Sequence, residues 1–230
     1  MNKLQRAAER AVVQALKLKK GESFLLVTDR AKIEIAEAVA AAAREAGAET
    51  TTYLMTETLR PIDAPTKLFR GLIESADAVL YMLDARIREK PFRGYMVKTG
   101  AERARICMMP GITRDMMERL VAIDFSAMDA FTKKVIRLVK DAERIEVENA
   151  AGTKIAFSVK GRRWINGSGD IGKKGRHGNL PAGECYTAPV EETFTGRLVI
   201  GLIDDKLGRG VLEFERGTLV RWKGKGIGEI

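Results

Sequence analysis

Residues 23–55, SFLLVTDRAKIEIAEAVAAAAREAGAETTTYLM, carry the signals of one complete strand–helix–strand unit. Residues 23–28 are a short apolar run, typical of a strand that is buried on both faces of a sheet. Apolar side chains then recur at helical spacing from residue 33, with Asp29 as a candidate cap before the helix and Gly47 as a candidate stop after it. Residues 49–55 are rich in β-formers and predict the second strand.

The same alternation of strand and helix continues through residue 109. A helix around 65–75 precedes a strand at 76–83, and a helix near 91–99 precedes a strand at 104–109. Strands separated by helices pair in parallel through right-handed crossovers. We therefore predict an α/β domain over residues 1–142, built on a doubly wound, mostly parallel sheet.

The ends of these strands are the places to look for a ligand site. Asp29 follows the first strand and Asp84 follows the third, and ligands of such sheets bind at the carboxyl ends of strands. For Asp29, a purely structural role as a helix cap is the competing interpretation. Neither glycine-rich phosphate-binding pattern follows the first strand, so the sequence does not favour a dinucleotide or P-loop function.

The periodicity changes near residue 143. Residues 113–143 predict helix in two pieces, whereas residues 144–150 and 153–159 flank Ala151-Gly152, a connection expected of a β-hairpin. Further strands are predicted at 197–203, 210–215 and 218–223, the last two joined by Arg216-Gly217. We therefore expect residues 143–230 to form a β-rich, α+β segment.

The glycine-rich stretch 161–183 has no strand or helix signal and predicts a long loop. Loops of this length in compact domains are usually functional or mobile. Lys173, Lys174, Arg176 and His177 lie in it and are candidates for binding an anion or a substrate; a solvated loop is the competing interpretation.

The segment GNLPAGECYTAPVEETFTG, residues 178–196, follows directly. Its turn residues lead into a short strand that begins at Glu184, a position suited to holding a carboxylate at the wall of a cleft. Strand alternation places Tyr186 on the same face as Glu184, where its hydroxyl could hydrogen-bond beside the carboxylate or its ring could simply pack.

Composition narrows the class of protein further. Charged residues make up 31% of the chain, with only two glutamines and four asparagines, a pattern typical of thermophile proteins. The net charge is +9, but the basic residues are scattered along the chain, so a nucleic-acid binder is the less favoured reading.

Cys107 and Cys185 form no CxxC pair, which disfavours a disulfide framework or a thiolate metal site. No apolar run has the roughly 18–20 residues of a membrane span, and we expect a cytoplasmic protein without a membrane partner.

Three stretches resemble the thermophilic metalloaminopeptidase family of the aminopeptidase T and S type, including its archaeal leucyl aminopeptidase-like members. They are MPGIT-RDMMERL, AGTKIAFSVKGR and, above all, GNLPAGECYTAPVEETFTGRLVI. The resemblance implies metal-dependent removal of N-terminal residues from peptides. It also implies that Glu184 is a ligand of a two-metal site for zinc, cobalt, manganese or iron, and that Glu229, in the terminal Gly-Glu-Ile, is a second ligand.

The remaining ligands of that family include histidines that follow the Glu184 position. This chain has one histidine, His177, and it precedes Glu184. Because a catalytic divalent ion normally has three or more protein ligands, we expect an incomplete metal site, weak or no activity, and no assigned catalytic residue. Two alternatives remain open: a metal-independent protein that binds a small molecule or anion on the same fold, and a relative of the ring-cleaving iron dioxygenases that act on dihydroxypyridine. The expected partners are a peptide or small-molecule ligand and, through an exposed sheet edge, a second copy in a homodimer.

Overall fold

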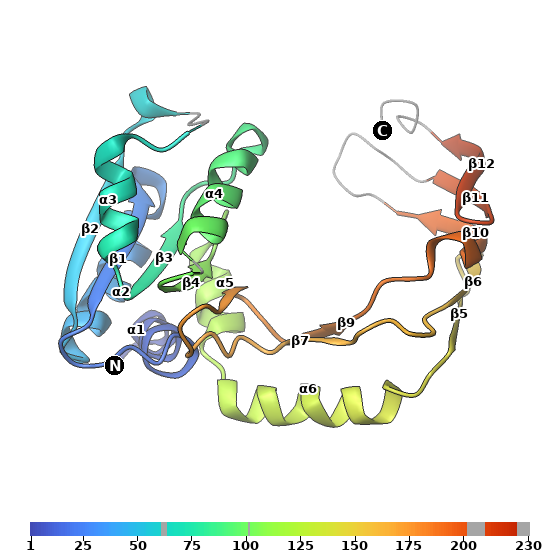
Figure 1. Cartoon of the computed structure of the whole chain (residues 1–230), viewed down its shortest axis with the longest axis horizontal. Coiled ribbons are helices and arrows are strands. Elements are labelled where there is room, and N and C mark those ends of the chain that lie inside the picture. The colour runs from blue at the N-terminus through green and yellow to red at the C-terminus, as the bar shows by residue number, and fades with distance from the viewer. Residues whose placement is uncertain (61–63, 101, 202–209, 225–230) are drawn as a thin grey trace. The chain divides into compact units, whose positions relative to one another are not determined.

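The structure is a computed structural model that describes residues 1–60, 64–100, 102–201 and 210–224 (Figure 1). The chain forms two compact units. The first unit is Met1–Lys133 with Gly167–Glu184, and the second is Lys134–Asn166 with Cys185–Ile230. The first unit thus includes residues 167–184, which the sequence analysis assigned to the second domain.

The first unit is built on a five-stranded sheet with strand order β2-β1-β3-β4-β8, in which every pair of neighbouring strands is parallel. Its strands are β1 (Ser23–Asp29), β2 (Glu49–Met55), β3 (Ala78–Met82), β4 (Arg105–Met108) and β8 (His177–Asn179). The helical elements of this part of the chain are α1 (Lys3–Glu9), η1 (Arg10–Ala15), η2 (Arg30–Lys32), α2 (Ile33–Glu45), η3 (Glu57–Leu59), α3 (Lys67–Ser75), η4 (Ile87–Glu89), α4 (Lys90–Gly100), α5 (Arg114–Met116), η5 (Met117–Val121) and the first residues of α6 (Phe125–Val139).

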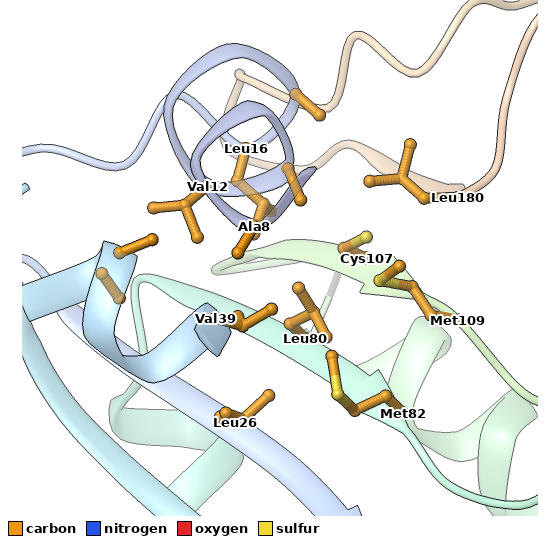
Figure 2. Close-up of a cluster of buried hydrophobic side chains, with 14 of the residues drawn as sticks. Ala8, Val12, Leu16, Leu26, Val39, Leu80, Met82, Cys107, Met109 and Leu180 are labelled. Atoms are coloured by element: carbon orange, nitrogen blue, oxygen red, sulfur yellow. The ribbon is translucent and has the colours of Figure 1, made fainter. Parts of the chain in front are cut away.

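Both faces of this sheet are buried, as the apolar runs predict. Leu26 and Leu80 point into one hydrophobic cluster with residues of α1, η1 and α2, and Figure 2 shows part of it. Leu25 and Val79, the neighbours of those two residues in sequence, lie in a second cluster with residues of α3 and α4. The doubly wound α/β architecture is therefore confirmed.

The stretch 161–183 is not a structureless loop, so that prediction is wrong. It contains β7 (Ile165–Gly167) and β8, and β8 extends the parallel sheet beside β4. The Ile106 N–H donates to the Arg176 carbonyl at 2.9 Å, and the Leu180 N–H donates to the Met108 carbonyl at 3.0 Å. A strand of His, Gly and Asn has no apolar periodicity, so its backbone pairing left no signal in the sequence.

The second unit is an antiparallel sheet with strand order β12-β11-β10-β6-β5, which confirms the predicted β-rich segment. Its strands are β5 (Arg144–Glu148), β6 (Lys154–Ser158), β10 (Thr195–Ile200), β11 (Gly210–Glu215) and β12 (Thr218–Gly224), and η6 (Glu191–Thr193) precedes β10. Both predicted hairpins form. Asn149 Oδ1 accepts the Ala151 and Thr153 N–H groups in the first, and Arg216 and Gly217 adopt positive φ in the second. A separate two-stranded sheet joins β7 to β9 (Glu184–Tyr186).

Among the described residues, no helix combines the length and the apolar character that a membrane crossing requires.

Candidate functional site

The carboxyl edge of the parallel sheet has its topological switch point between β1 and β3, where ligands of doubly wound sheets commonly bind. Here Asp29 closes β1. Its Oδ1 accepts the Lys32 N–H at 3.1 Å, which confirms that it caps the following helical turn. Its Oδ2 accepts the Asp84 N–H at 2.7 Å and a guanidinium N–H of Arg60 at 2.6 Å.

Arg60 fills this crevice with its own side chain, which is completely buried. Its Nε and Nη2 donate to the two carboxylate oxygens of Glu89 at 2.8 and 2.6 Å, and Nη2 also donates to the Asp84 carbonyl at 2.5 Å. The hydrogen bond to Glu89 is the main reason that the pKa of Arg60 is raised despite its burial. The crevice between β1 and β3 is therefore occupied by an internal ion cluster, and the sequence analysis identified only its Asp29 and Asp84.

The other end of the same edge, beyond β4 and β8, is open. A pocket of about 430 Å³ lies there, within the first unit. It is lined by Arg119 and Leu120 of η5, Ile123, Met128 of α6, Asn179 of β8, and Pro181, Ala182, Gly183 and Glu184 of the connection into β9.

Two glycines hold Glu184 at this pocket. The Gly183 N–H donates to the Gly167 carbonyl at 2.9 Å, which fixes the backbone just before Glu184. A Cβ at Gly167 would lie 2.7 Å from Glu184 Cγ, so only glycine leaves room for the glutamate side chain in this place. Leu180, buried in the core, anchors the start of the connection. The predicted rigid presentation of Glu184 thus has a physical basis.

The pocket offers few polar groups against an apolar wall. Within the described part of the chain, no hydrogen bond or ion pair engages the Glu184 carboxylate, which is exposed to solvent. Arg119 pairs with Asp115 at 3.0 Å one helical turn away, and Asn179 brings an amide. This arrangement suits a small ligand that packs on apolar side chains and presents a hydrogen-bond donor or a positive charge to Glu184.

The basic residues singled out from the sequence lie elsewhere. Lys173, Lys174 and Arg176 precede β8, and the adjacent Gly175 N–H donates to the Ala104 carbonyl just before β4. Since β8 runs parallel to β4, these residues and His177 lie at the amino edge of the sheet, whereas the pocket lies at its carboxyl edge. The structure does not bring them together with Glu184.

The other predicted residues are placed as follows. Tyr186 lies on β9 two residues after Glu184, with 47% of its surface exposed. Cys107 and Cys185 are both free thiols, and burial raises the pKa of Cys107. Glu229 lies outside the described residues.

The described residues do not fit a catalytic divalent ion. In the described ranges, no three His, Cys, Asp or Glu side chains come together in an arrangement that could hold a metal ion. Glu184 is a single carboxylate, and His177 stands at the opposite edge of the sheet. A catalytic divalent ion normally needs at least three protein ligands, and one exposed carboxylate would hold it only weakly.

A larger hollow of about 770 Å³ lies on the second unit, over β5, β6, β10 and β11. Its charged side chains largely satisfy one another: Arg144 pairs with Glu146 at 2.8 Å, and Lys154 with Glu148 at 3.8 Å. It has the character of a solvated sheet face, so the pocket beside Glu184 is the better candidate site.

Comparisons with known proteins address the family. Residues 5–207 match the family model described as NicX, 2,5-dihydroxypyridine 5,6-dioxygenase. No curated protein matches significantly. One similar solved structure is 2,5-dihydroxypyridine dioxygenase from Pseudomonas putida KT2440, 18% identical, with a TM-score of 0.72 over 97% of this chain and 69% of that chain. Another is wild-type AmpT from Thermus thermophilus, an aminopeptidase T, 18% identical, with a TM-score of 0.72 over 99% of this chain and 72% of that chain.

At 18% identity the two structures show a shared fold and no more. The aminopeptidase-like fold inferred from the Glu184 segment is therefore supported, while the family match favours the dioxygenase relative that the sequence analysis held as an alternative. Because the family model spans most of its length, the chain belongs to the NicX family.

Proposed function

We propose that the chain binds a small hydroxylated aromatic or N-heteroaromatic molecule in the pocket beside Glu184. The observation that carries the proposal is the position of one exposed carboxylate, held against Gly167, at the mouth of a mostly apolar pocket. The family name supplies the chemical class, because it describes an enzyme of 2,5-dihydroxypyridine.

The pocket suits such a ligand in size and chemistry. Small-molecule sites typically measure about 300–1,000 Å³ and are apolar apart from a few polar groups. Leu120, Ile123 and Met128 would pack against the ring, and Glu184 would accept a hydroxyl or ring N–H hydrogen bond. A hydrogen bond to a charged acceptor contributes about 1.5–3 kcal/mol, enough to orient the ring.

A divalent metal ion is the cofactor that both family resemblances imply, with iron suited to ring opening and zinc, cobalt or manganese to peptide hydrolysis. We derive no oxidative or hydrolytic step through it, because the described residues supply one carboxylate at the pocket. The proposal is therefore a binding function, with catalysis left to the experiment.

Removal of N-terminal residues from peptides is the second candidate. The specific observation in its favour is the fold similarity to AmpT, which equals that to the dioxygenase. In this reading Glu184 would pair with the α-ammonium group of a peptide. Both candidates use the same pocket, so one set of measurements separates them.

The test is calorimetric titration of 2,5-dihydroxypyridine and of a leucine dipeptide, each with and without Fe²⁺ or Zn²⁺, into the wild type and Glu184→Gln. We expect dihydroxypyridine to bind, and Glu184→Gln to weaken that binding about tenfold or more. Glu192→Gln, an exposed glutamate on η6, is the matched control and should change nothing.

Equal affinities of the wild type and Glu184→Gln would contradict the proposal. Binding of the dipeptide alone would favour the second candidate. Ring opening can be monitored as the loss of dihydroxypyridine absorbance under oxygen with Fe²⁺. If it occurs, the chain also has a catalytic role.

A further inference from the structure

The pocket beside Glu184 is lined by two charged side chains of opposite sign. They are Arg119 and Glu184 itself, and the rest of the lining among the described residues is apolar or neutral. The two side chains do not pair with each other, so their charged atoms lie farther apart than the roughly 4 Å of an ion pair. A cation and an anion held apart along one apolar wall fit a ligand that carries an anionic group at one position and a hydrogen-bond donor at another.

The helical element η5 fixes the position of Arg119. Met117 and Val121, two residues before and after it, are buried in the hydrophobic core of the first unit. The Ala122 N–H donates to the Met117 carbonyl at 3.2 Å, five residues back, which is the spacing of a π-helix. π-Helical turns are rare and occur frequently at functional sites. The core thus anchors η5 from within and leaves Arg119 on its outer side, at the pocket wall.

The present partner of Arg119 is a weak competitor for its guanidinium. Arg119 donates to one carboxylate oxygen of Asp115, from Nε at 3.3 Å and from Nη2 at 3.0 Å. The side chains are 62% and 71% exposed, and exposed pairs of this kind add little stability. Because both bonds go to a single oxygen, the pair also lacks the two parallel bonds of the strongest arginine–carboxylate contacts. A ligand carboxylate in the pocket can therefore replace Asp115 at little cost.

We propose that Arg119 determines specificity by binding a carboxylate of the ligand, so that the preferred ligands are hydroxylated aromatic carboxylic acids. The proposal rests on the function proposed above and adds a second anchor to it. Glu184 accepts a ring hydroxyl, Leu120 and Ile123 pack against the ring, and Arg119 donates to the carboxylate. The planar guanidinium matches the two oxygens of a carboxylate. A phosphate group, with its higher charge, would be repelled more strongly by Glu184.

Calorimetric titration of 2,5-dihydroxybenzoate and 2,5-dihydroxybenzamide tests the proposal. The two molecules share the ring and both hydroxyls, and only the first carries a negative charge. We expect the wild type to bind the acid about tenfold more tightly than the amide, because a hydrogen bond between two charged groups is stronger than one to a neutral amide. Arg119→Met keeps an apolar side chain and should bring the ratio of the two dissociation constants close to one. Glu184→Gln should weaken the binding of both molecules and keep the preference for the acid.

Two further variants separate recognition from a general effect of charge or folding. Arg114→Met removes the same charge from the neighbouring turn, where Arg114 pairs with Glu118 and Glu34 away from the pocket lining, and should keep the preference for the acid. Asp115→Asn releases Arg119 from its competing partner and should tighten the binding of the acid about two- to fivefold, with the amide unchanged. A merely structural role of Arg119 would give no such gain.

Equal affinities for the acid and the amide in the wild type, both weakened by Glu184→Gln, would overturn this inference and leave the proposed function standing. A preference for the acid that survives Arg119→Met would also overturn it, since the carboxylate would then bind elsewhere. If neither molecule binds, the proposed function and this inference fail together. Titration of a leucine dipeptide and its C-terminal amide completes the test. Discrimination by Arg119 within the peptide pair alone would overturn the aromatic class of ligand.

Discussion

Arg60 shows how one residue decides the fate of a possible ligand site. Its guanidinium lies between Asp29 and Glu89, both buried, at the point of the sheet where a doubly wound fold would otherwise bind a ligand. Arg60→Met would leave two carboxylates in the interior without their counter-charge. We expect the free energy of unfolding, measured by urea denaturation, to fall by about 3–5 kcal/mol.

The control is Arg86→Met, which removes an ion pair between Arg86 and Glu57 whose side chains are 35% and 66% exposed. Exposed pairs contribute at most about 1 kcal/mol, so this variant should unfold close to the wild type. If Arg60→Met lost no more stability than Arg86→Met, the buried cluster would not be the structural centre that its geometry indicates.

Glu184 and Arg60 differ in how far the sequence could identify their roles. Glu184 stands in a local segment whose turn residues and strand signal lie within a few positions of it, and the structure places it at a pocket. Arg60 has its partners 31 and 29 residues away, one at the end of β1 and the other in η4. Neither contact leaves a periodic pattern, so only the folded chain reveals the cluster.

Elements with a hydrophobic period were predictable because, as for Glu184, the signal lies in neighbouring residues of the sequence. β2 and β11 fall on the expected residues, 49–55 and 210–215, because their side chains alternate or belong to long β-forming runs. β7 and β8 were missed, since three-residue strands with at most one apolar residue show no hydrophobic period and are held by backbone pairing with distant strands. The sequence analysis therefore placed the basic residues before β8 near Glu184, although β8 lies between them and puts them at opposite edges of the sheet.

Pairing between β6 and β10 depends on one glycine. Gly196 has φ +114°, and a Cβ there would lie 2.2 Å from the Lys154 carbonyl oxygen, which is backbone and cannot rotate away. Gly196→Ala should therefore lower the free energy of unfolding by about 3 kcal/mol or more, through strain and displaced strands. Thermal unfolding followed by circular dichroism at 218 nm, a wavelength sensitive to β structure, measures the loss.

Gly71→Ala is the matched control on α3, where no atom lies within 4 Å of the added Cβ. Alanine is the better helix former, so this change should stabilise the first unit by about 0.5–1 kcal/mol. The two substitutions are chemically identical and should have opposite signs; stabilisation by both would contradict the close approach of β6 to β10.

At the scale of the molecule, apolar burial is unequally divided. Both hydrophobic clusters consist of residues of the first unit. Among the described residues of the second unit, Val159 is the one apolar side chain that is buried. A single sheet without a buried core has little to oppose the entropy of its unfolding. The second unit should therefore open at a lower free energy than the first, before global unfolding.

Hydrogen exchange measured by mass spectrometry tests this order. Amides of β10, β11 and β12 should exchange faster than those of β1, β3 and β4. Slow exchange of β10–β12, at the rate of the central strands of the first unit, would mean that the antiparallel sheet is stable without a buried core of its own.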